Sequence, residues 1–511
     1  MNIGDWIKNW GDISPQKMAV IDNGHDFSYK RLNQRCNQVA NFLLQKGISK
    51  GERVGVLLYN CHEYLEIYFA LAKIGAILVP INWRMAPPEI VYILEDCKAR
   101  FLFFHQDFLD TATYLRDKIG YVKDYVSLGP RDIFWARNYQ KIESYPVNEP
   151  VPKNKPDLED PHIILYTSGT TGFPKGAVLS NRKTFYNSLN ANIFYKLTPD
   201  DIFLVSRPLF HSGGLLVDST PALYKGATVI IKRHFTPQEY LETIEKYKVT
   251  IIETSATFLN FMLQECDINK YDLSSLKSYY TGGERVSPSL LKAYHKRDIP
   301  LSQIFGMTET SIVTWLATED ATRKVGSVGK PVLHGELRVV DPDMQPIKPG
   351  EIGEILVKGP ILMSGYWNRP EITNEVVKDG WLHTGDLATV DDEGFIYIVD
   401  REKDMFISGG ENIYPTEIEK VLLTNPKIWD VAVFGVPDER WGEVGKALVI
   451  LKKNETMSAA DVIGFLTDKI GKFKIPNYVE FVDRFPRTAT GKIQKYLLAQ
   501  NSKKEKKSIK T

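Results

Sequence analysis

The run Tyr166-Thr-Ser-Gly-Thr-Thr-Gly-Phe-Pro-Lys-Gly176 is the most informative stretch of this sequence. It follows a short apolar segment, Ile163-Ile-Leu-Tyr166, which is typical of a buried strand. Glycines and small hydroxyl residues let a backbone close around a phosphate and present N–H groups to it, while Lys175 adds positive charge. The run is not a Walker A loop, because Gly176 follows Lys175 where that motif has Ser or Thr. We therefore interpret it as a phosphate-binding loop of another type.

Short apolar runs alternate with segments of helical periodicity on both sides of this loop. Upstream, we expect a strand at 53–58 and a helix at 63–76. Downstream, the pattern predicts a helix at 237–248 and further strands at 228–231, 250–253 and 277–280. Alternation of this kind is typical of parallel sheets covered by helices. The sequence therefore predicts two doubly wound α/β units that follow one another.

The texture changes twice towards the C-terminus. From Gly326, short strands with glycines between them, at 336–340 and 353–357, predict a small β-barrel. After Asp400 a new alternation predicts helices at 416–423, 459–470 and 493–500 and strands at 431–434, 447–450 and 478–481. We expect an α/β protein with three parts: a large N-terminal domain (1–402), a small α+β C-terminal domain (403–500) and a basic disordered tail (501–511).

The composition excludes several classes of protein. Lys+Arg 64 and Asp+Glu 63 leave a net charge of +1, so there is no broad positive field for nucleic acid. The four cysteines lie far apart without metal-ligand spacing, as in a reduced cytosolic protein. Apolar runs are shorter than the roughly 20 residues that cross a bilayer. We expect a cytoplasmic protein; the lysine-rich tail is either solubilising or a weak peripheral contact with anionic lipid.

Further motifs are distributed along the chain: Pro208-Leu-Phe-His-Ser-Gly-Gly214, Thr281-Gly-Gly-Glu284, Phe305-Gly-Met-Thr-Glu-Thr310, Gly380-Trp-Leu-His-Thr-Gly-Asp386, Asp400-Arg-Glu-Lys-Asp404 and Pro486-Arg-Thr-Ala-Thr-Gly-Lys492. With the phosphate loop, they resemble in content and order the adenylate-forming superfamily of acyl-CoA synthetases, firefly-type luciferases and peptide-synthetase adenylation domains. The resemblance covers nearly the whole chain and is nearest to medium- and long-chain fatty acid–CoA ligases. It implies that ATP, with Mg²⁺, activates a small carboxylic acid as an acyl-adenylate, whose acyl group then passes to coenzyme A.

The resemblance implies a nucleotide site built from several motifs. It assigns the phosphates to Thr167, Ser168, Gly169, Thr170, Thr171, Gly172 and Lys175. It places the adenosine beside Gly283, Glu284, Phe305, Gly306, Met307, Asp386 and Arg401, the last two at the ribose. Phe305 stands where the family usually has Tyr, so stacking is kept without a hydroxyl. Thr308 is expected on the α-phosphate, and Glu309, with Thr170, at Mg²⁺, an ion that prefers oxygen ligands.

Two further residues are candidates for the chemistry itself. Lys492 corresponds to the catalytic lysine of the family, whose charge would stabilise the carboxylate and phosphate oxygens as pyrophosphate leaves. His211 lies in the segment that the resemblance assigns to the acid. Its role stays open between gating the pocket, orienting the carboxylate and filling space, because an ionised carboxylate needs no base.

The two half-reactions require different arrangements of the C-terminal domain. Adenylation needs Lys492 over the phosphates, whereas thiol attack needs an open channel to the acyl carbon. The resemblance implies that the domain is mobile and rotates about a hinge at Lys403. Gly409 and Gly410 are then the candidates for the channel, since glycines allow the pantetheine arm to approach closely. Trp441 is a candidate contact for the CoA nucleotide, with a half-buried structural Trp as the alternative.

The segments that the resemblance assigns to the acid are apolar or small: Leu209, Phe210, Gly213, Gly214, Leu215, Leu216, Ile304, Met307, Ile312 and Val313. They include no Arg or Lys that could pair with a second carboxylate. We therefore expect a hydrophobic monoacid, with medium- or long-chain fatty acids first and aryl or alicyclic acids as the alternative. A stand-alone adenylation enzyme that loads a carrier protein is a further alternative, and a homodimer stays open.

Overall fold

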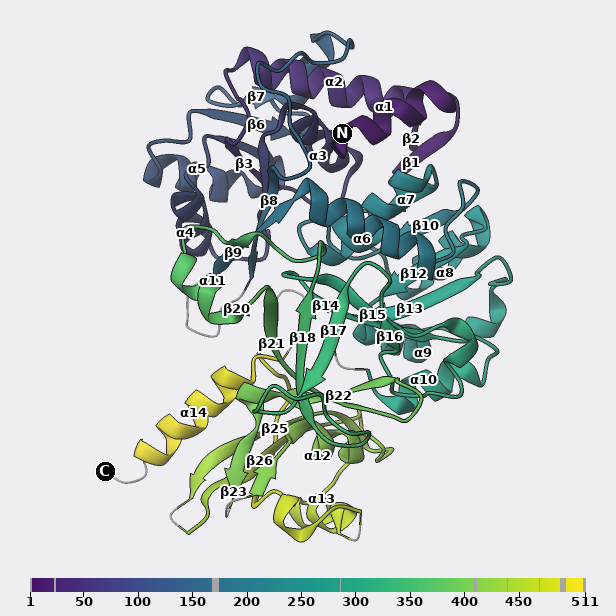
Figure 1. Cartoon of the computed structure of the whole chain (residues 1–511), viewed down its shortest axis with the longest axis vertical. Helices are drawn as coiled ribbons and strands as arrows, with labels where there is room; N and C mark the ends of the chain where they lie inside the picture. The colour runs from purple at the N-terminus through teal and green to yellow at the C-terminus, as the bar shows by residue number, and fades with distance from the viewer. Residues whose placement is uncertain are drawn as a thin grey trace.

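The computed structural model describes residues 2–22, 24–167, 174–284, 286–408, 411–438, 440–467, 469–487 and 493–508, without the side chains of 501 and 503–508. Within these residues, two large sheets with helices form most of the N-terminal part (Figure 1). A third, antiparallel sheet lies between them and a small C-terminal unit, from which the last helix projects. The predicted α/β class, with a large N-terminal part and a smaller C-terminal unit, is confirmed.

The first sheet contains the strands on both sides of the phosphate loop. In the described residues its order is β19 (Gly365–Tyr366), β9 (Lys175–Ser180), β8 (Pro161–Thr167), β4 (Ile77–Pro80), β3 (Arg53–Leu57), β5 (Phe101–His105), β6 (Asp124–Leu128) and β7 (Arg137–Asn138). The strands from β8 to β7 are parallel, whereas β8 and β9 form an antiparallel hairpin. The phosphate loop is therefore the connection of a hairpin, so no helix begins behind it.

The second sheet corrects the expectation that the two units simply follow one another. Its order among the described residues is β16 (Lys330–Pro331), β15 (Ser311–Trp315), β14 (Ser302–Met307), β13 (Ser278–Gly282), β12 (Ile251–Thr254), β10 (Ile202–Val205), β11 (Thr228–Ile231), β1 (Met18–Asp22) and β2 (His25–Ser28). Strand β1 pairs in parallel with β11, and β2 folds back on β1. The N-terminal segment thus completes the sheet of the later unit.

The third sheet is the small antiparallel unit expected after Gly326. Its described strands are β17 (Glu336–Val340), β18 (Gly353–Lys358), β21 (Trp381–Val390), β20 (Val377–Lys378) and β22 (Ile396–Arg401), and they form a half-barrel. Strand β22 pairs with β21 and ends at Arg401, immediately before the predicted hinge. The half-barrel therefore connects the large sheets to the C-terminal unit.

The C-terminal unit is built on a long hairpin. Its described strands are β24 (Glu411–Ile413), β23 (Phe406–Ser408), β26 (Gly442–Leu451), β25 (Ile428–Asp438) and β27 (Tyr478–Phe481). Its helices are α12 (Pro415–Leu422), α13 (Ala459–Leu466) and α14 (Lys495–Ser508). Helix α14 continues past residue 501, so the predicted boundary of a disordered tail falls inside an element. The Lys-rich run contains good helix formers, which accounts for the difference.

The helices of the N-terminal part are α1 (Gly4–Ile13), α2 (Tyr29–Gln45), α3 (His62–Ile74), α4 (Pro87–Cys97), α5 (Leu109–Lys118), α6 (Asn181–Phe194), α7 (Thr220–Lys225), α8 (Pro237–Tyr247), α9 (Ala256–Glu265), α10 (Pro288–His295) and α11 (Pro370–Val376). One continuous core joins both large sheets and includes α2, α3 and α6. Helix α3 is buried on every side from Tyr64 to Ile74, as its apolar sequence requires. None of the helices in the described ranges has the length and apolarity needed to cross a membrane.

Candidate functional site

The base of the phosphate loop is fixed by the β8–β9 hairpin. Thr167 pairs with Lys175, and the Thr167 hydroxyl donates to the Lys175 carbonyl at 3.4 Å. The Lys175 ammonium lies 5.5 Å from the centre of the Tyr366 ring. Ser168, Gly169, Thr170, Thr171 and Gly172 lie outside the described residues, so their phosphate contacts, and the metal contact of Thr170, stay predictions. What the structure describes is the point at which the loop leaves and rejoins the sheet.

Thr308 and Glu309 lie in the turn that joins β14 to β15. Both are buried, with 8% and 6% exposure. The Tyr366 hydroxyl donates to Glu309 Oε1 at 2.8 Å, and the Met363 N–H donates to the Glu309 carbonyl at 2.7 Å. The segment that begins at Met363 therefore holds this turn in place. The carboxylate lies where a hard cation could be bound without a long side-chain rearrangement.

Tyr366 connects three of the predicted motifs. Burial raises the pKa of its hydroxyl, the Glu309 carboxylate raises it further, and the Arg401 guanidinium opposes the shift. Because β19 pairs with β9, the ring also lies beside Lys175. Sequence reasoning missed Tyr366. The preceding Gly365 is the sequence signal that could have pointed to it. Its φ of +134° favours glycine and allows the short strand β19 to pair with β9.

The predicted ribose residues face one another across β21 and β22. Asp386 pairs with Arg401 in the strand register, and Arg401 Nε lies 2.8 Å from Asp386 Oδ1. Asp386 is 3% exposed. Lys403 is close by: burial and the Arg401 charge lower the pKa of its ammonium, while Asp404 and Asp386 oppose the shift. The structure thus brings these two motifs together at the end of the half-barrel.

The predicted adenine segment is part of β14. Phe305 and Met307 pack partly buried against the core. Gly306 is required by geometry, because a Cβ there would lie 1.9 Å from the Ser311 carbonyl oxygen. Contact of these residues with adenine stays a prediction.

The Thr281–Glu284 segment follows at the end of β13. Gly283 has a φ of +79°, a conformation that favours glycine. The Glu284 carboxylate accepts from the Thr257 N–H at 2.8 Å and from its hydroxyl at 3.1 Å, at the start of α9. The structure therefore gives Glu284 a helix-capping contact, and its contact with nucleotide stays a prediction.

The predicted thiol-side residues gather on the C-terminal unit. Ser408 pairs with Gly442, so the end of β23 lies beside the hairpin that carries Trp441. The Trp441 ring is 46% exposed, and Arg440 lies 4.8 Å from its centre. Gly409, Gly410 and Lys492 lie outside the described residues, and their roles stay predictions. At this exposure Trp441 could contact the CoA nucleotide or serve as a half-buried structural residue, so both readings stay predictions.

His211 lies at the start of the apolar segment assigned to the acid. Its Nδ1 accepts from the Gly213 N–H at 3.3 Å, and its carbonyl accepts from the Leu215 N–H at 3.2 Å. Both contacts fix the turn into the π-helical stretch Gly213–Ser219. The geometry therefore favours a structural or gating role for His211, which remains a prediction.

A buried charge cluster beside this segment escaped the sequence reasoning. The Arg207 guanidinium donates to Asp218 at 2.8 and 3.3 Å and also pairs with Glu253. It lies directly under Gly213, where a Cβ would come within 2.6 Å of it. Burial raises the pKa of both Asp218 and Glu253, and the Arg207 charge opposes each shift. The cation next to the pocket segment is therefore already neutralised by the protein.

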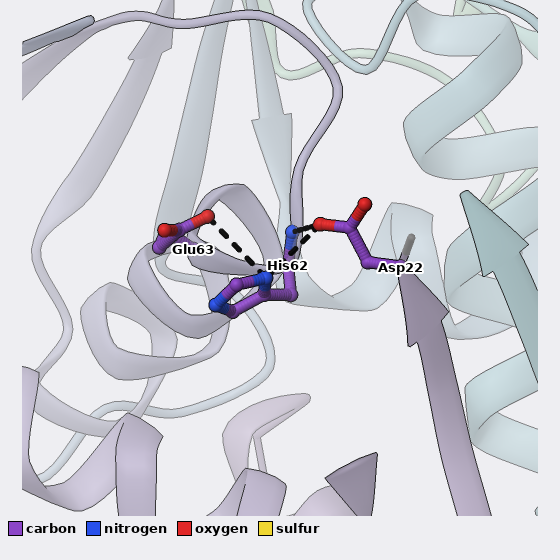
Figure 2. A group of neighbouring side chains, drawn as sticks. All are labelled: Asp22, His62 and Glu63. Atoms are coloured by element: carbon purple, nitrogen blue, oxygen red, sulfur yellow. Dashed lines mark hydrogen bonds and ion pairs between the residues drawn. The ribbon is translucent and has the colours of Figure 1, made fainter. Parts of the chain in front are cut away.

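A second polar cluster lies away from the nucleotide residues, where β1 meets α3 (Figure 2). Asp22 Oδ2 accepts from the His62 backbone N–H at 2.9 Å and lies 3.0 Å from His62 Nδ1. Glu63 lies 3.5 Å from the same ring nitrogen. In the described part of the chain, this is the group of His and carboxylate ligand atoms that could hold a metal ion. The hydrogen bonds between Asp22 and His62 attach β1 to the start of α3, and this structural role explains the cluster.

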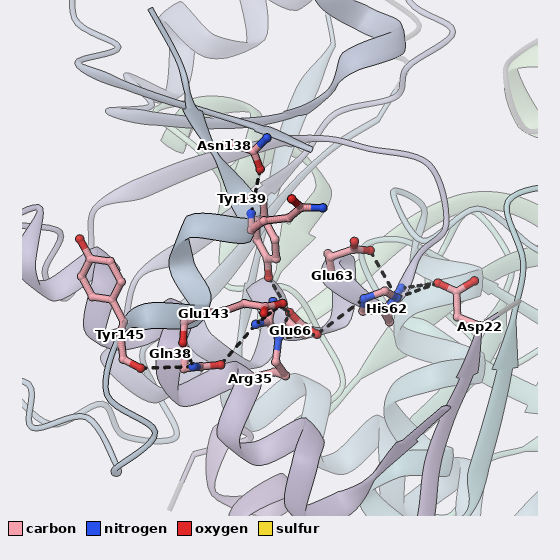
Figure 3. A network of polar contacts seen from close by, with 11 residues as sticks. Asp22, Arg35, Gln38, His62, Glu63, Glu66, Asn138, Tyr139, Glu143 and Tyr145 are labelled. Carbon is pink, nitrogen blue, oxygen red and sulfur yellow. Dashed lines mark hydrogen bonds and ion pairs between the residues drawn. The ribbon is translucent and has the colours of Figure 1, made fainter. Parts of the chain in front are cut away.

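The same cluster continues into the interior of the first unit (Figure 3). Glu66 is fully buried and accepts from Arg35 at 3.2 and 3.3 Å and from the Tyr139 hydroxyl at 2.7 Å. His62 Nε2 lies 3.9 Å from Glu66. This network joins α2, α3 and the Tyr139–Ser144 turn, so its role is to fix the first unit rather than to bind substrate.

The donors around Tyr366 suit a nucleoside triphosphate with Mg²⁺. Glu309 supplies a carboxylate for the cation, Thr308 a hydroxyl and Lys175 an ammonium for phosphate oxygens. Asp386 supplies acceptors of the kind that a ribose diol needs. Three separate motifs meet around Tyr366 through Lys175, Glu309 and Arg401, and Arg401 in turn pairs with Asp386. The residues present therefore fit the nucleotide and the metal ion.

Comparison with known proteins agrees with this geometry. The AMP-binding enzyme family matches residues 7–367, and its C-terminal domain matches residues 417–492. Indoleacetate–CoA ligase of Aromatoleum aromaticum is 39% identical over 97% of each chain. Long-chain-fatty-acid–CoA ligase FadD13 of Mycobacterium tuberculosis is 34% identical over 98% of each chain. The crystal structure of an anthranilate CoA ligase with anthranoyl-AMP superimposes with a TM-score of 0.91 at 30% identity, covering 98% of this chain and 97% of the other. The chain therefore belongs to the AMP-binding enzyme family and is an acid–thiol ligase that uses ATP, Mg²⁺ and coenzyme A.

Proposed function

We propose that this ligase activates an aromatic carboxylic acid as its adenylate and transfers the acyl group to the thiol of coenzyme A. In the first step a carboxylate oxygen attacks the α-phosphorus and pyrophosphate leaves. In the second, the thiol sulfur attacks the acyl carbon, the thiol proton passes to solvent and AMP leaves. The observation that carries the nucleotide half is the meeting of Lys175, Glu309 and Arg401 around Tyr366.

Each residue at this meeting point has a distinct task in the proposal. Glu309 would hold Mg²⁺, which when bound neutralises charge on the triphosphate. Lys175 and Thr308 orient the phosphate oxygens, and Asp386, kept in place by Arg401, orients the ribose. Lys492 is the predicted source of the charge that stabilises the reacting oxygens. No covalent intermediate with the protein is needed.

Two observations support the choice of aromatic acids over the fatty acids that the sequence favoured. The relative at 39% identity is an indoleacetate ligase, and the anthranilate ligase supplies the superimposed structure. In this chain, Phe210 of the acid segment lies edge-on to Trp83 at 6.3 Å, and the Arg84 guanidinium lies 4.4 Å from the centre of Trp83. Such an aromatic wall favours flat aromatic substrates by edge-to-face contact.

Fatty acids are the second candidate. FadD13 is a long-chain-fatty-acid ligase by name and is 34% identical to this chain. The residues Leu215, Leu216 and Ile312 are apolar and buried, as an alkyl chain would require. Arg207, beside the acid segment, is engaged by Asp218 and Glu253, so it is not available to pair with a second carboxylate of the acid.

A panel of acids decides between the two candidates. We expect kcat/KM for indoleacetate, ferulate and anthranilate to include a value at least about tenfold above those for octanoate and palmitate. Phe210→Leu should reduce the preference, since it removes the aromatic edge. Phe434→Leu, the same truncation at a buried site in β25, should leave the preference unchanged. Faster turnover of palmitate or octanoate than of every aromatic acid would contradict the proposal.

The nature of the thiol can be tested separately. Chromatography should detect the acyl-CoA thioester when purified protein, ATP, Mg²⁺ and free coenzyme A are mixed with the preferred acid. Formation of adenylate without any thioester, followed by loading of a carrier domain, would favour the stand-alone adenylation enzyme instead.

A further inference from the structure

Lys183 is a buried cation close to the nucleotide residues. It lies in the first turn of α6, where its backbone N–H donates to Ser180 Oγ at 3.2 Å. Its side chain is 0% exposed. Removing an ammonium from water costs several kcal/mol, and a helix N-terminus disfavours positive charge. A lysine in this position therefore requires compensation from its surroundings.

The compensating groups belong to the turn that carries Glu309. The Lys183 ammonium donates to Ser311 Oγ, and Ser311 is the first residue of β15. Burial lowers the pKa of Lys183 to about 7, and the Glu309 charge opposes the shift. The Lys183 charge also acts on His162, whose pKa is lowered to about 3 by burial and by that charge. The favourable field at Lys183 thus comes from the nucleotide motif.

The turn itself has a strained conformation. Ser311 has a φ of +59°, a left-handed conformation that residues with a side chain rarely adopt. Thr310 Oγ1 donates to the Ser311 carbonyl at 2.9 Å and accepts from the Met307 N–H at 3.2 Å. The Thr310 hydrogen bonds close the turn on one side of Thr308 and Glu309 in the sequence, and the Lys183 ammonium holds Ser311 at its end. Thr308 and Glu309 lie between these two attachments.

We propose that Lys183 is a positioning residue for the nucleotide half-reaction: its ammonium fixes Ser311 and thereby the turn that presents Thr308 and Glu309. The inference rests on the proposed function, because Thr308 and Glu309 take their roles from it. Lys183 touches neither nucleotide nor acid in this scheme. It acts by keeping a metal-binding carboxylate in one orientation, and partners of that kind typically change affinity or activity by about 10- to 100-fold.

The test compares Lys183→Met with Lys73→Met. Lys73 is also buried, but it lies in α3 and its ammonium pairs with Glu149 at 2.7 Å. Titration calorimetry measures binding of Mg²⁺-ATP without any acid. We expect Lys183→Met to weaken this binding about tenfold or more, with no fall in Tm, because methionine replaces a buried charge. Lys73→Met should lower Tm by leaving Glu149 without its cation and should bind Mg²⁺-ATP like the wild type.

Ser311→Ala provides a second variant that removes only the hydroxyl partner. It should weaken Mg²⁺-ATP binding in the same direction. Unchanged affinity in Lys183→Met, or in Ser311→Ala if the lysine variant does not fold, would overturn the inference, as would a loss of Tm without a loss of affinity. A wild-type protein that binds Mg²⁺-ATP but forms no thioester would contradict the proposed function. The comparison of Mg²⁺-ATP affinity between wild type and Lys183→Met would still test the role of Lys183.

Discussion

At the scale of single residues, the site depends on where one carboxylate points. Glu309 is buried in a tight turn, with its side chain held by the Tyr366 hydroxyl and its carbonyl by the Met363 N–H. A carboxylate fixed in this way can accept a metal ion without paying the entropy of ordering a mobile side chain. The Tyr366 ring in turn is fixed by the pairing of β19 with β9.

We predict that Glu309→Gln lowers the rate of adenylation by about 100-fold. The amide keeps the shape of the side chain and can still accept from Tyr366, but it lacks the charge that holds Mg²⁺. Pyrophosphate release measures the effect. Tyr366→Phe, which keeps the charge and loses the hydroxyl, should cost about tenfold. Equal rates for wild type and Glu309→Gln at saturating Mg²⁺ would show that the carboxylate does not bind the ion.

Motif spacing named the residues that we propose to carry the chemistry but not those that we propose to position them. Glu309, Asp386 and Arg401 could be named because each lies in a recognisable run. Tyr366 and Lys183 could not, because their importance comes from contacts between distant segments. Tyr366 reaches Glu309 across 57 positions of sequence, and Lys183 reaches Ser311 across 128.

At the scale of elements, the β1–β2 hairpin is the clearest difference from the sequence-based expectation. Strands 336–340 and 478–481 have the predicted bounds, as β17 and β27. Strand β1 was missed because β2, rather than a helix, follows Met18–Asp22, so the segment lacks the strand–helix alternation that marks a parallel strand. Its place beside β11 is decided by packing against α3, which no local pattern encodes.

The attachment of this hairpin to α3 should depend on pH through His62. Burial lowers the pKa of the imidazole, but the hydrogen bond to Asp22 and the charges of Glu63 and Glu66 outweigh it, so the folded-state pKa is raised. A raised pKa gives stability that is complete below the unfolded pKa, near 6.5, and that is lost as pH rises through the folded pKa.

We therefore predict that His62→Gln destabilises the protein more at pH 6 than at pH 9. The difference between the two pH values should be roughly 0.5–1 kcal/mol, as for a partly exposed ion pair. Urea unfolding of wild type and variant measures it. A larger destabilisation at pH 9 would contradict the charged form of His62 as the stabilising one.

At the scale of the whole molecule, the proposed switch between adenylation and thioester formation depends on the boundary between the half-barrel and the C-terminal unit. Arg401 lies on the large side with Asp386, and Lys403 follows two residues later. Asp400 Oδ2 accepts from the Thr416 N–H at 2.8 Å, and the Lys420 ammonium donates to the Ile398 carbonyl at 3.2 Å. Both contacts join β22 to α12 across the predicted hinge, so a rotation there must break them.

We predict that Lys403→Pro slows thioester formation from supplied acyl-adenylate by about tenfold or more. Pyrophosphate release, which reports the adenylation step, should be largely kept. Proline fixes the backbone torsion that a rotation would change. Lys403→Ala removes the same side chain and leaves the backbone mobile, so it should retain thioester formation. If Lys403→Pro forms thioester at the wild-type rate, the hinge does not lie at this position.

The account as a whole depends on a triphosphate bound between the β8–β9 hairpin and the Glu309 turn, with its α-phosphorus attacked by the acid. Exchange of labelled pyrophosphate into ATP tests this most directly. With Mg²⁺ and an accepted acid, the wild type should catalyse the exchange, whereas Lys492→Ala should lose it and still convert supplied acyl-adenylate to thioester. Absence of exchange in the wild type with every acid of the panel, or equal loss of both reactions in Lys492→Ala, would contradict the account.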